Sequence, residues 1–167
     1  MWKEVEKFFS NSPAKLKVAR VMVELGLSIN DEGRIVCGNV EIPDTSIARA
    51  ISVDRRVVRQ TVKEIINNER MRNIFIKIKP AGSFLKEVAP ELGYGVLEIR
   101  AQPTAIGVIA KATSYIAEAG LSIRQILAED PDLNPDPKLL IITDKKVPGE
   151  VISKLLTIPT VTKVSIS

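Results

Sequence analysis

The fold of the second half of the chain is decided by one stretch, YGVLEIRAQPTAIGVIAKATSYIAEAGLSIRQILA, at residues 94–128. It opens with an apolar, strand-like segment at residues 94–101. Residues 106–119 then carry apolar side chains at the three- and four-residue spacing of one helix face, and Gly120 ends that pattern. Residues 121–128 are again strand-like. The stretch therefore predicts a strand, a helix and a second strand.

The remaining residues extend this pattern to a complete small domain. A loop rich in Pro and Asp at residues 130–137 precedes the very apolar segment 138–143, which we expect to be a central strand. Residues 147–156 predict a helix with Pro148 in its first turn, and residues 161–167 a closing strand. The order βαββαβ is that of a ferredoxin-like fold, with both helices on one face of a four-stranded antiparallel sheet. The apolar side chains of the other face favour a homodimer or a higher homo-oligomer that covers it.

The first 80 residues predict a helical domain with a small β-hairpin. Helices are expected at residues 1–10, 14–26, 46–51 and 55–68, a hairpin at 35–42 around Gly38 and Asn39, and a further strand at 74–78. Pro80 to Ser83 opens a connector, in which residues 84–88 are expected to form a short helix before Pro90. We therefore expect an α+β chain with domains at 1–80 and 94–167, joined by a linker at 81–93.

The composition argues against an enzyme. The chain has no His, and Cys37 is its one cysteine, so a Ser-His-Asp triad is excluded and a zinc, haem or Cys-His site is nearly so. No Gly-rich phosphate loop is present. The acidic pair Glu129 and Asp130 stands beside the Pro-rich loop, where acids are usually solvated. We expect no catalytic residue, no metal and no cofactor.

The sequence offers no sign of a membrane or secretory segment. No apolar run approaches the ~18–20 residues that span a bilayer, and the N-terminus lacks the apolar core of a signal peptide. A single cysteine fits a reducing compartment. We expect a soluble, cytoplasmic protein.

Positive charge is concentrated in one region. The chain has a net charge of +4, and residues 49–79 contain nine basic and three acidic residues. Such a local basic block indicates a polyanionic partner.

Within this block, the segment SIARAISVDRRVVRQTV at residues 46–62 resembles the helix-turn-helix of bacterial and archaeal regulators. Ala48 stands where the first helix must be small, and Val53 is the apolar residue of the turn. Ser52 occupies the position that is usually Gly. Asp54 suits the N-cap of the second helix.

The second helix has one apolar and one basic face. At about 100° per residue, its basic side chains and Gln60 fall within one arc, while the β-branched residues fall on the opposite arc. Arginine, lysine and glutamine are the residue types that contact phosphates and base edges. The candidate DNA-binding residues are Arg49, Arg55, Arg56, Arg59, Gln60 and Lys63. The alternative is a solvated basic face without a DNA partner.

Two further features bear on the nucleic acid. Residues 35–42 and residues 74–79 are both candidates for a DNA-contacting wing, and the sequence does not choose between them. Aromatic residues are only 4% of the chain, which disfavours base stacking on single strands and favours double-stranded DNA.

The segment IGVIAKATSYIAEAGLSI at residues 106–123 resembles the first helix and second strand of ACT domains. The chain as a whole resembles an archaeal group of predicted regulators of amino-acid metabolism that contain an ACT domain. The resemblance implies an amino-acid site in the loop before that helix, with the second strand of a neighbouring subunit opposite. The implied ligand-binding residues are Gln102, Pro103, Thr104, Ala105, Ile106, Gly107 and Ser122.

Three of these positions depart from the family pattern. Thr104 stands where the family often has Asp, Ile106 where it often has Pro, and Ser122 where it often has Asn. An acid for the ammonium group of the ligand is therefore missing from the loop. The alternative is an ACT-like domain that serves only for dimerisation.

Together these features predict an amino-acid-responsive transcriptional regulator that binds DNA as a dimer. The alternative is a regulatory or assembly subunit that does not bind DNA, dimerises through its ACT-like domain and controls a metabolic enzyme.

Overall fold

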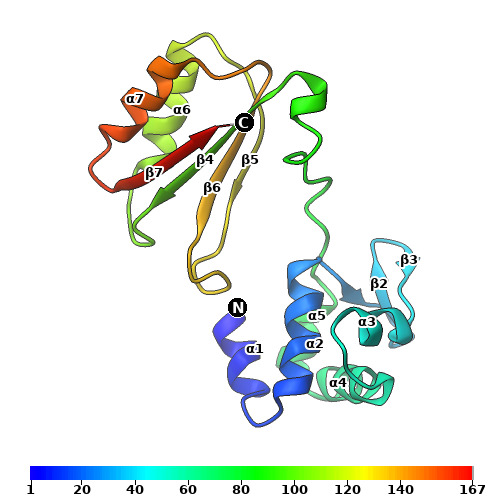
Figure 1. Cartoon of the computed structure of the whole chain (residues 1–167). Coiled ribbons are helices and arrows are strands. Elements are labelled where there is room, and N and C mark those ends of the chain that lie inside the picture. The colour runs from blue at the N-terminus through cyan, green and yellow to red at the C-terminus, as the bar shows by residue number, and fades with distance from the viewer. Residues whose placement is uncertain (167) are drawn as a thin grey trace. The chain divides into compact units, whose positions relative to one another are not determined.

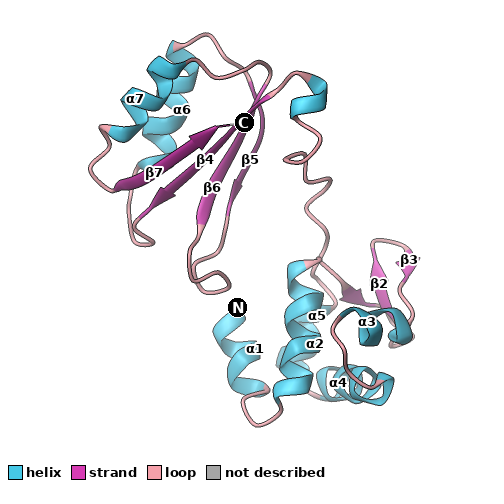
Figure 2. Ribbon diagram, in the orientation of Figure 1, coloured by secondary structure: helices cyan, strands magenta, loops and turns pink. Residues whose placement is uncertain are grey.

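The computed structural model describes residues 1–166, which divide into two compact units, residues 1–82 and the described residues from 83 onward. Helices and short strands make up the first unit, and a four-stranded sheet with two helices dominates the second (Figures 1 and 2). Both sheets are antiparallel. The chain is therefore of mixed α and β structure, and each unit has its own buried side chains.

The first unit follows the predicted helices closely. Its elements are α1 (Trp2–Phe8), α2 (Pro13–Glu24), β1 (Ser28–Ile29), β2 (Ile35–Cys37), β3 (Val40–Glu41), α3 (Asp44–Ala50), α4 (Arg55–Asn67) and α5 (Glu69–Phe75). The predicted hairpin is observed as β2 and β3, and it gains a third strand because β1 pairs with β2. Sequence reasoning missed β1, which has only two residues and so no period to detect.

The prediction of a strand at residues 74–78 is wrong, because α5 extends to Phe75 and no strand follows it in this unit. The Asn68 side chain caps α5 by accepting a hydrogen bond of 3.0 Å from the Met71 amide. Met71 and Phe75, four residues apart, are both buried on the same side of the helix. Helical packing thus overrides the local alternation, and residues 74–79 do not form a strand-like wing.

The second unit has the predicted order βαββαβ. Its elements are a single 3₁₀ turn η1 (Pro90–Leu92), then β4 (Gly95–Ala101), α6 (Val108–Glu118), β5 (Ile123–Ala128), β6 (Lys138–Thr143), α7 (Gly149–Leu156) and β7 (Val161–Ile166). The strands lie in the order β5-β6-β4-β7. The very apolar β6 is therefore internal, as its composition predicts.

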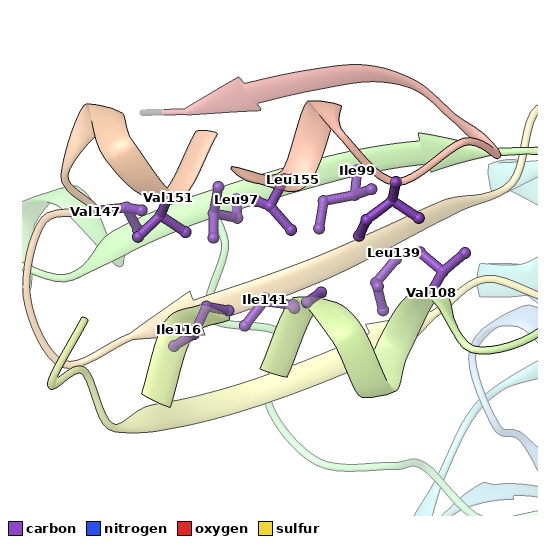
Figure 3. Close-up of a cluster of buried hydrophobic side chains, with 11 residues drawn as sticks. Leu97, Ile99, Val108, Ile116, Leu139, Ile141, Val147, Val151 and Leu155 are labelled. Atoms are coloured by element: carbon purple, nitrogen blue, oxygen red, sulfur yellow. The ribbon is translucent and has the colours of Figure 1, made fainter. Parts of the chain in front are cut away.

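One face of this sheet is closed by α6 and α7. Alternate residues of β4 and β6, including Leu97, Ile99 and Ile141, meet buried side chains of both helices, among them Ile116 and Leu155 (Figure 3). Burying each such side chain contributes about 1.5–3 kcal/mol. This core fixes where α6 begins, above the carboxyl end of β4.

The opposite face is covered in part by the chain itself. Val96, Leu140 and Ile142 are buried against Ala89, with Leu85 beside them. The Gln125 side chain accepts a hydrogen bond of 3.0 Å from the Leu85 amide and donates one of 2.8 Å to the Ser83 carbonyl. Residues 83–93 are thus part of the second unit, whereas we expected a linker at 81–93.

The covering segment is held at its centre by an ion pair. The Lys86 ammonium binds the Glu98 carboxylate of β4, and this hydrogen bond lowers the pKa of Glu98. Residues 84–88 form no helix, contrary to expectation, and the only helical turn here is η1 (Figure 2). Residues 86–89 are turns instead, in which the Leu85 carbonyl accepts hydrogen bonds of 3.2 and 2.8 Å from the Val88 and Ala89 amides.

Candidate functional site

The turn between α3 and α4 shows why its sequence matters. Ser52 has φ +54°, and it is the one non-glycine residue with positive φ among the described residues. This is the left-handed region that glycine adopts without strain. The Val53 amide donates a hydrogen bond of 2.9 Å to the Ala48 carbonyl, which closes the turn. Ala48 is buried, as packing of α4 across α3 requires.

The N-terminus of α4 is capped as predicted. The Asp54 side chain accepts a hydrogen bond of 2.7 Å from the Arg56 amide. Val58, Thr61, Val62 and Ile65 of this helix are buried. The buried Thr61 hydroxyl donates a hydrogen bond of 2.8 Å to the Val57 carbonyl, so it has a hydrogen-bond partner despite its burial.

The face of α4 opposite this packing is exposed and basic. Arg55, Arg56, Arg59, Gln60 and Lys63 are all exposed in the first unit, and so is Arg49 in the last turn of α3. The structure therefore brings five cations and an amide to the outer side of α3 and α4.

Two ion pairs connect α4 to neighbouring helices, and one of them engages a basic residue of the exposed face. Arg59 Nε lies 2.9 Å from Asp44 Oδ2 at the start of α3, and Lys15 of α2 lies 2.5 Å from Glu64. Arg55, Arg56 and Lys63 form no ion pair within the described residues. Arg59 must share its guanidinium with Asp44, so the other three cations are better placed to bind an anion.

In the second unit, the loop from Gln102 to Gly107 joins β4 to α6. A turn closes its first half, with the Ala105 amide donating 2.9 Å to the Gln102 carbonyl. Gly107 is the N-cap of α6 at φ +86°, and no side chain caps this helix. A Cβ at Gly107 would meet nothing within 4 Å. Glycine suits this position because of its positive φ, and not because a side chain would be crowded.

The loop is strongly exposed. Gln102, Pro103, Thr104, Ile106 and Gly107 are exposed and Ala105 is half-buried, while the Ile106 side chain is 98% exposed.

Ser122 does not lie near this loop within one chain. Its amide donates a hydrogen bond of 2.9 Å to Asp144 Oδ1. This bond lies at the end of the sheet where Ile123 pairs with Thr143. The loop starts at the other end of the seven-residue strand β4, about 20 Å away. Any joint site would need Ser122 from a second copy.

The structure also places a pocket at this loop. A cavity of about 130 Å³ is lined by Gln102, Pro103 and Ala105, and by residues of α6 and of the loop between β5 and β6. Glu129 is among the lining residues. Sequence reasoning interpreted Glu129 as a solvated acid; only the pairing of β5 with β6 brings it to this pocket.

Other site types find no support among residues 1–166. No group of three or more Cys, Asp or Glu side chains is placed to hold a metal ion. No helix in this part of the chain has the length and apolar character to cross a membrane.

Comparison of the sequence with models of protein families gives no match, and neither does a search among curated proteins. Among solved structures, a transcriptional regulatory protein of the AsnC family from Pyrococcus furiosus is similar with 8% identity, 92% coverage of this chain, 85% coverage of the other and a TM-score of 0.27. A transcriptional regulator from Neisseria meningitidis in complex with L-Met matches with 11% identity, 92% and 86% coverage and a TM-score of 0.26.

Proposed function

We propose that the chain is a ligand-responsive transcriptional regulator that binds double-stranded DNA through the exposed face of α4. The observation that supports this most is the division of α4 into a buried apolar face and an exposed basic one, directly after a closed turn from α3. Arg55, Arg56 and Lys63 would contact phosphates or guanine edges, and Gln60 an adenine. The hairpin β2–β3 is the remaining candidate for a wing.

The ligand half of the proposal lies in the second unit. An amino acid would place its carboxylate at the first turn of α6, where the amides after Gly107 have no side-chain cap. Gln102, Pro103, Thr104, Ala105 and Ile106 would form the surrounding loop. Ser122 would contribute from a neighbouring copy. Binding there would change the geometry of a dimer and with it the fit to DNA.

The surface expected to form the dimer interface is not the apolar face that the sequence predicted. We expected the open face of the sheet to be apolar, but Val96, Leu140 and Ile142 are already covered by residues of the same chain. The remaining side chains of that face include Glu98, Arg100 and Lys138. A homodimer stays part of the proposal, and light scattering at micromolar concentration tests it.

Duplex binding tests the main proposal. Fluorescence anisotropy of a labelled duplex should show affinity that falls steeply with salt, because each phosphate contact releases counterions. Random duplex DNA at low salt is sufficient for this test, since phosphate contacts do not depend on sequence. Absence of any binding at low salt would refute the proposal.

One observation favours the alternative, a subunit that binds another protein. The segment covering the sheet exposes large apolar side chains at Phe84, Val88 and Leu92, and Phe84 and Leu92 are each 53% exposed. If duplex binding fails, this surface is where a protein partner should be sought.

A further inference from the structure

The pocket at the carboxyl ends of β4 and β5 has an apolar floor and one carboxylate. Ile99, Leu139 and Val108 form part of the lining, and they lie together at one end of the core cluster (Figure 3). Pro103, Pro131 and Pro137 add rigid walls. Glu129 is the only acidic residue that lines the pocket.

The Glu129 carboxylate is held in place by the backbone of β6. The Glu129 amide donates 2.9 Å to the Lys138 carbonyl, and its Oε2 accepts 3.1 Å from the Lys138 amide. The side chain is half-buried. The hydrogen bond at Oε2 orients the carboxylate, so that it needs little reorganisation before it accepts a further donor.

Within the described residues, Glu129 has no cation of its own in an ion pair. Lys138 also lines the pocket, but its ammonium lies 3.9 Å from Glu98 on the other face of the sheet. Lys86 feels the charge of Glu129 only as a minor cause of its raised pKa, and its ammonium is bound to Glu98. The Oε1 atom of Glu129 is therefore available to a ligand.

We propose that this pocket binds a small aliphatic primary ammonium group, with Glu129 accepting its hydrogen bond. The assignment rests on the proposed function, because it supplies the acid that the loop at residues 102–107 lacks. The pocket volume of about 130 Å³ is well below the ~300–1,000 Å³ of pockets that enclose a drug-sized ligand. The pocket thus takes only a small group such as an alkylammonium, and the rest of a larger ligand stays outside.

The experiment uses three probes on the full chain: L-alanine, ethylamine, which lacks the carboxylate, and propionate, which lacks the amine. Amide chemical shifts in ¹H–¹⁵N spectra report binding at Glu129, Lys138 and Ala105. L-alanine and ethylamine should bind in the millimolar range, because so few atoms are buried. Thermal shift with the same probes gives an independent readout.

The decisive variant is Glu129→Gln, in which the amide oxygen can still accept from Lys138 and the fold is kept. It should weaken ethylamine and L-alanine at least tenfold and leave propionate unchanged. The matched control is Asp130→Asn, which removes the same charge one residue away and outside the pocket lining. It should leave all three probes unchanged.

A second variant tests the place rather than the charge. Ala128→Leu adds volume at a pocket-lining residue that is otherwise exposed. It should block ethylamine while leaving Glu129 in place.

The outcomes separate this inference from the proposed function. Equal binding of ethylamine to the wild type and to Glu129→Gln overturns the inference, as does a wild type that binds none of the amines at high millimolar concentration. Either result leaves duplex binding untouched. Amine binding in a chain that binds no duplex would instead refute the proposed function alone.

Discussion

The helices α4 and α6 each begin a candidate site, and they begin in opposite ways. In α4 the Asp54 carboxylate accepts a hydrogen bond from the Arg56 amide, so a negative group already caps the first turn. In α6 the N-cap is Gly107, and no side chain reaches the first amides. An anion at α4 must therefore be bound by side-chain cations, whereas an anion at α6 would meet free backbone donors.

The largest expected effect concerns the cations of α4. Replacing Arg55 and Arg56 together with Ala removes two exposed cations that have no ion pair in the described structure. Each lost charged contact is worth about 1.5 kcal/mol, or roughly tenfold in affinity. Duplex binding should weaken by about a hundredfold, and the salt slope should flatten by about 2. Fluorescence anisotropy across a salt series measures both.

Two controls sharpen this prediction. Arg59→Ala alone should weaken binding less than Arg55→Ala alone, because Arg59 is tied to Asp44. Lys111→Ala, an exposed lysine of the second unit, should have no effect. Equal losses in Arg59→Ala and Arg55→Ala would show that the ion pair with Asp44 does not hold in solution.

For α6, the conformation of the cap should set the stability of its first turn. Gly107→Ala introduces no clash, since nothing lies within 4 Å of the new Cβ, yet it forces an L-residue to φ +86°. The left-handed conformation costs an L-residue about 1–2 kcal/mol. Urea unfolding should report a loss of this size for the second unit.

The chain offers a matched control for that loss. Gly149 at the start of α7 also has open space around its Cβ position, but its φ is not positive. Gly149→Ala should be neutral or slightly stabilising, because Ala has the better helix propensity. A loss in Gly149→Ala as large as in Gly107→Ala would exclude φ as the cause.

The two caps also show how far the sequence alone could lead. Asp54 could be predicted as an N-cap because a short acceptor before a helical pattern is a local signal, and the hydrogen bond is observed. Gly107 could be singled out by the resemblance, but its positive φ and the open space around its Cβ position come only from the coordinates.

What the sequence could not provide was long-range placement. Glu129 reaches the loop at residues 102–107 only through the β5–β6 pairing, and Asp44 reaches Arg59 across a turn. The cover of the open sheet face by residues 83–93 was missed for the same reason. The local pattern of that segment predicted a short helix at residues 84–88, whereas its packing depends on contacts with β4, β5 and β6.

At α4 the cap can be removed directly. Asp54→Ala deletes the acceptor of the Arg56 amide and should destabilise the first unit by about 1 kcal/mol, the usual cost of losing an N-cap. Asp54→Asn keeps an oxygen acceptor and should lose much less. Urea unfolding followed by circular dichroism measures both variants, and identical losses would mean that the negative charge, and not the hydrogen bond, is what stabilises α4.

The smallest effect is expected at the turn before that cap. Ser52 holds φ +54° in an exposed position, where a glycine would be unstrained. Ser52→Gly removes this strain but adds freedom to the unfolded chain, so the net gain should be about 0.5 kcal/mol or less. Ser52→Val should instead destabilise, because a β-branched residue tolerates positive φ poorly. The difference between the two variants in the urea midpoint isolates the backbone contribution. Since neither change touches Arg55 or Arg56, duplex binding should stay at the wild-type level in Ser52→Gly. A Ser52→Gly variant that binds duplex more weakly would show that the strained turn itself sets the orientation of α4.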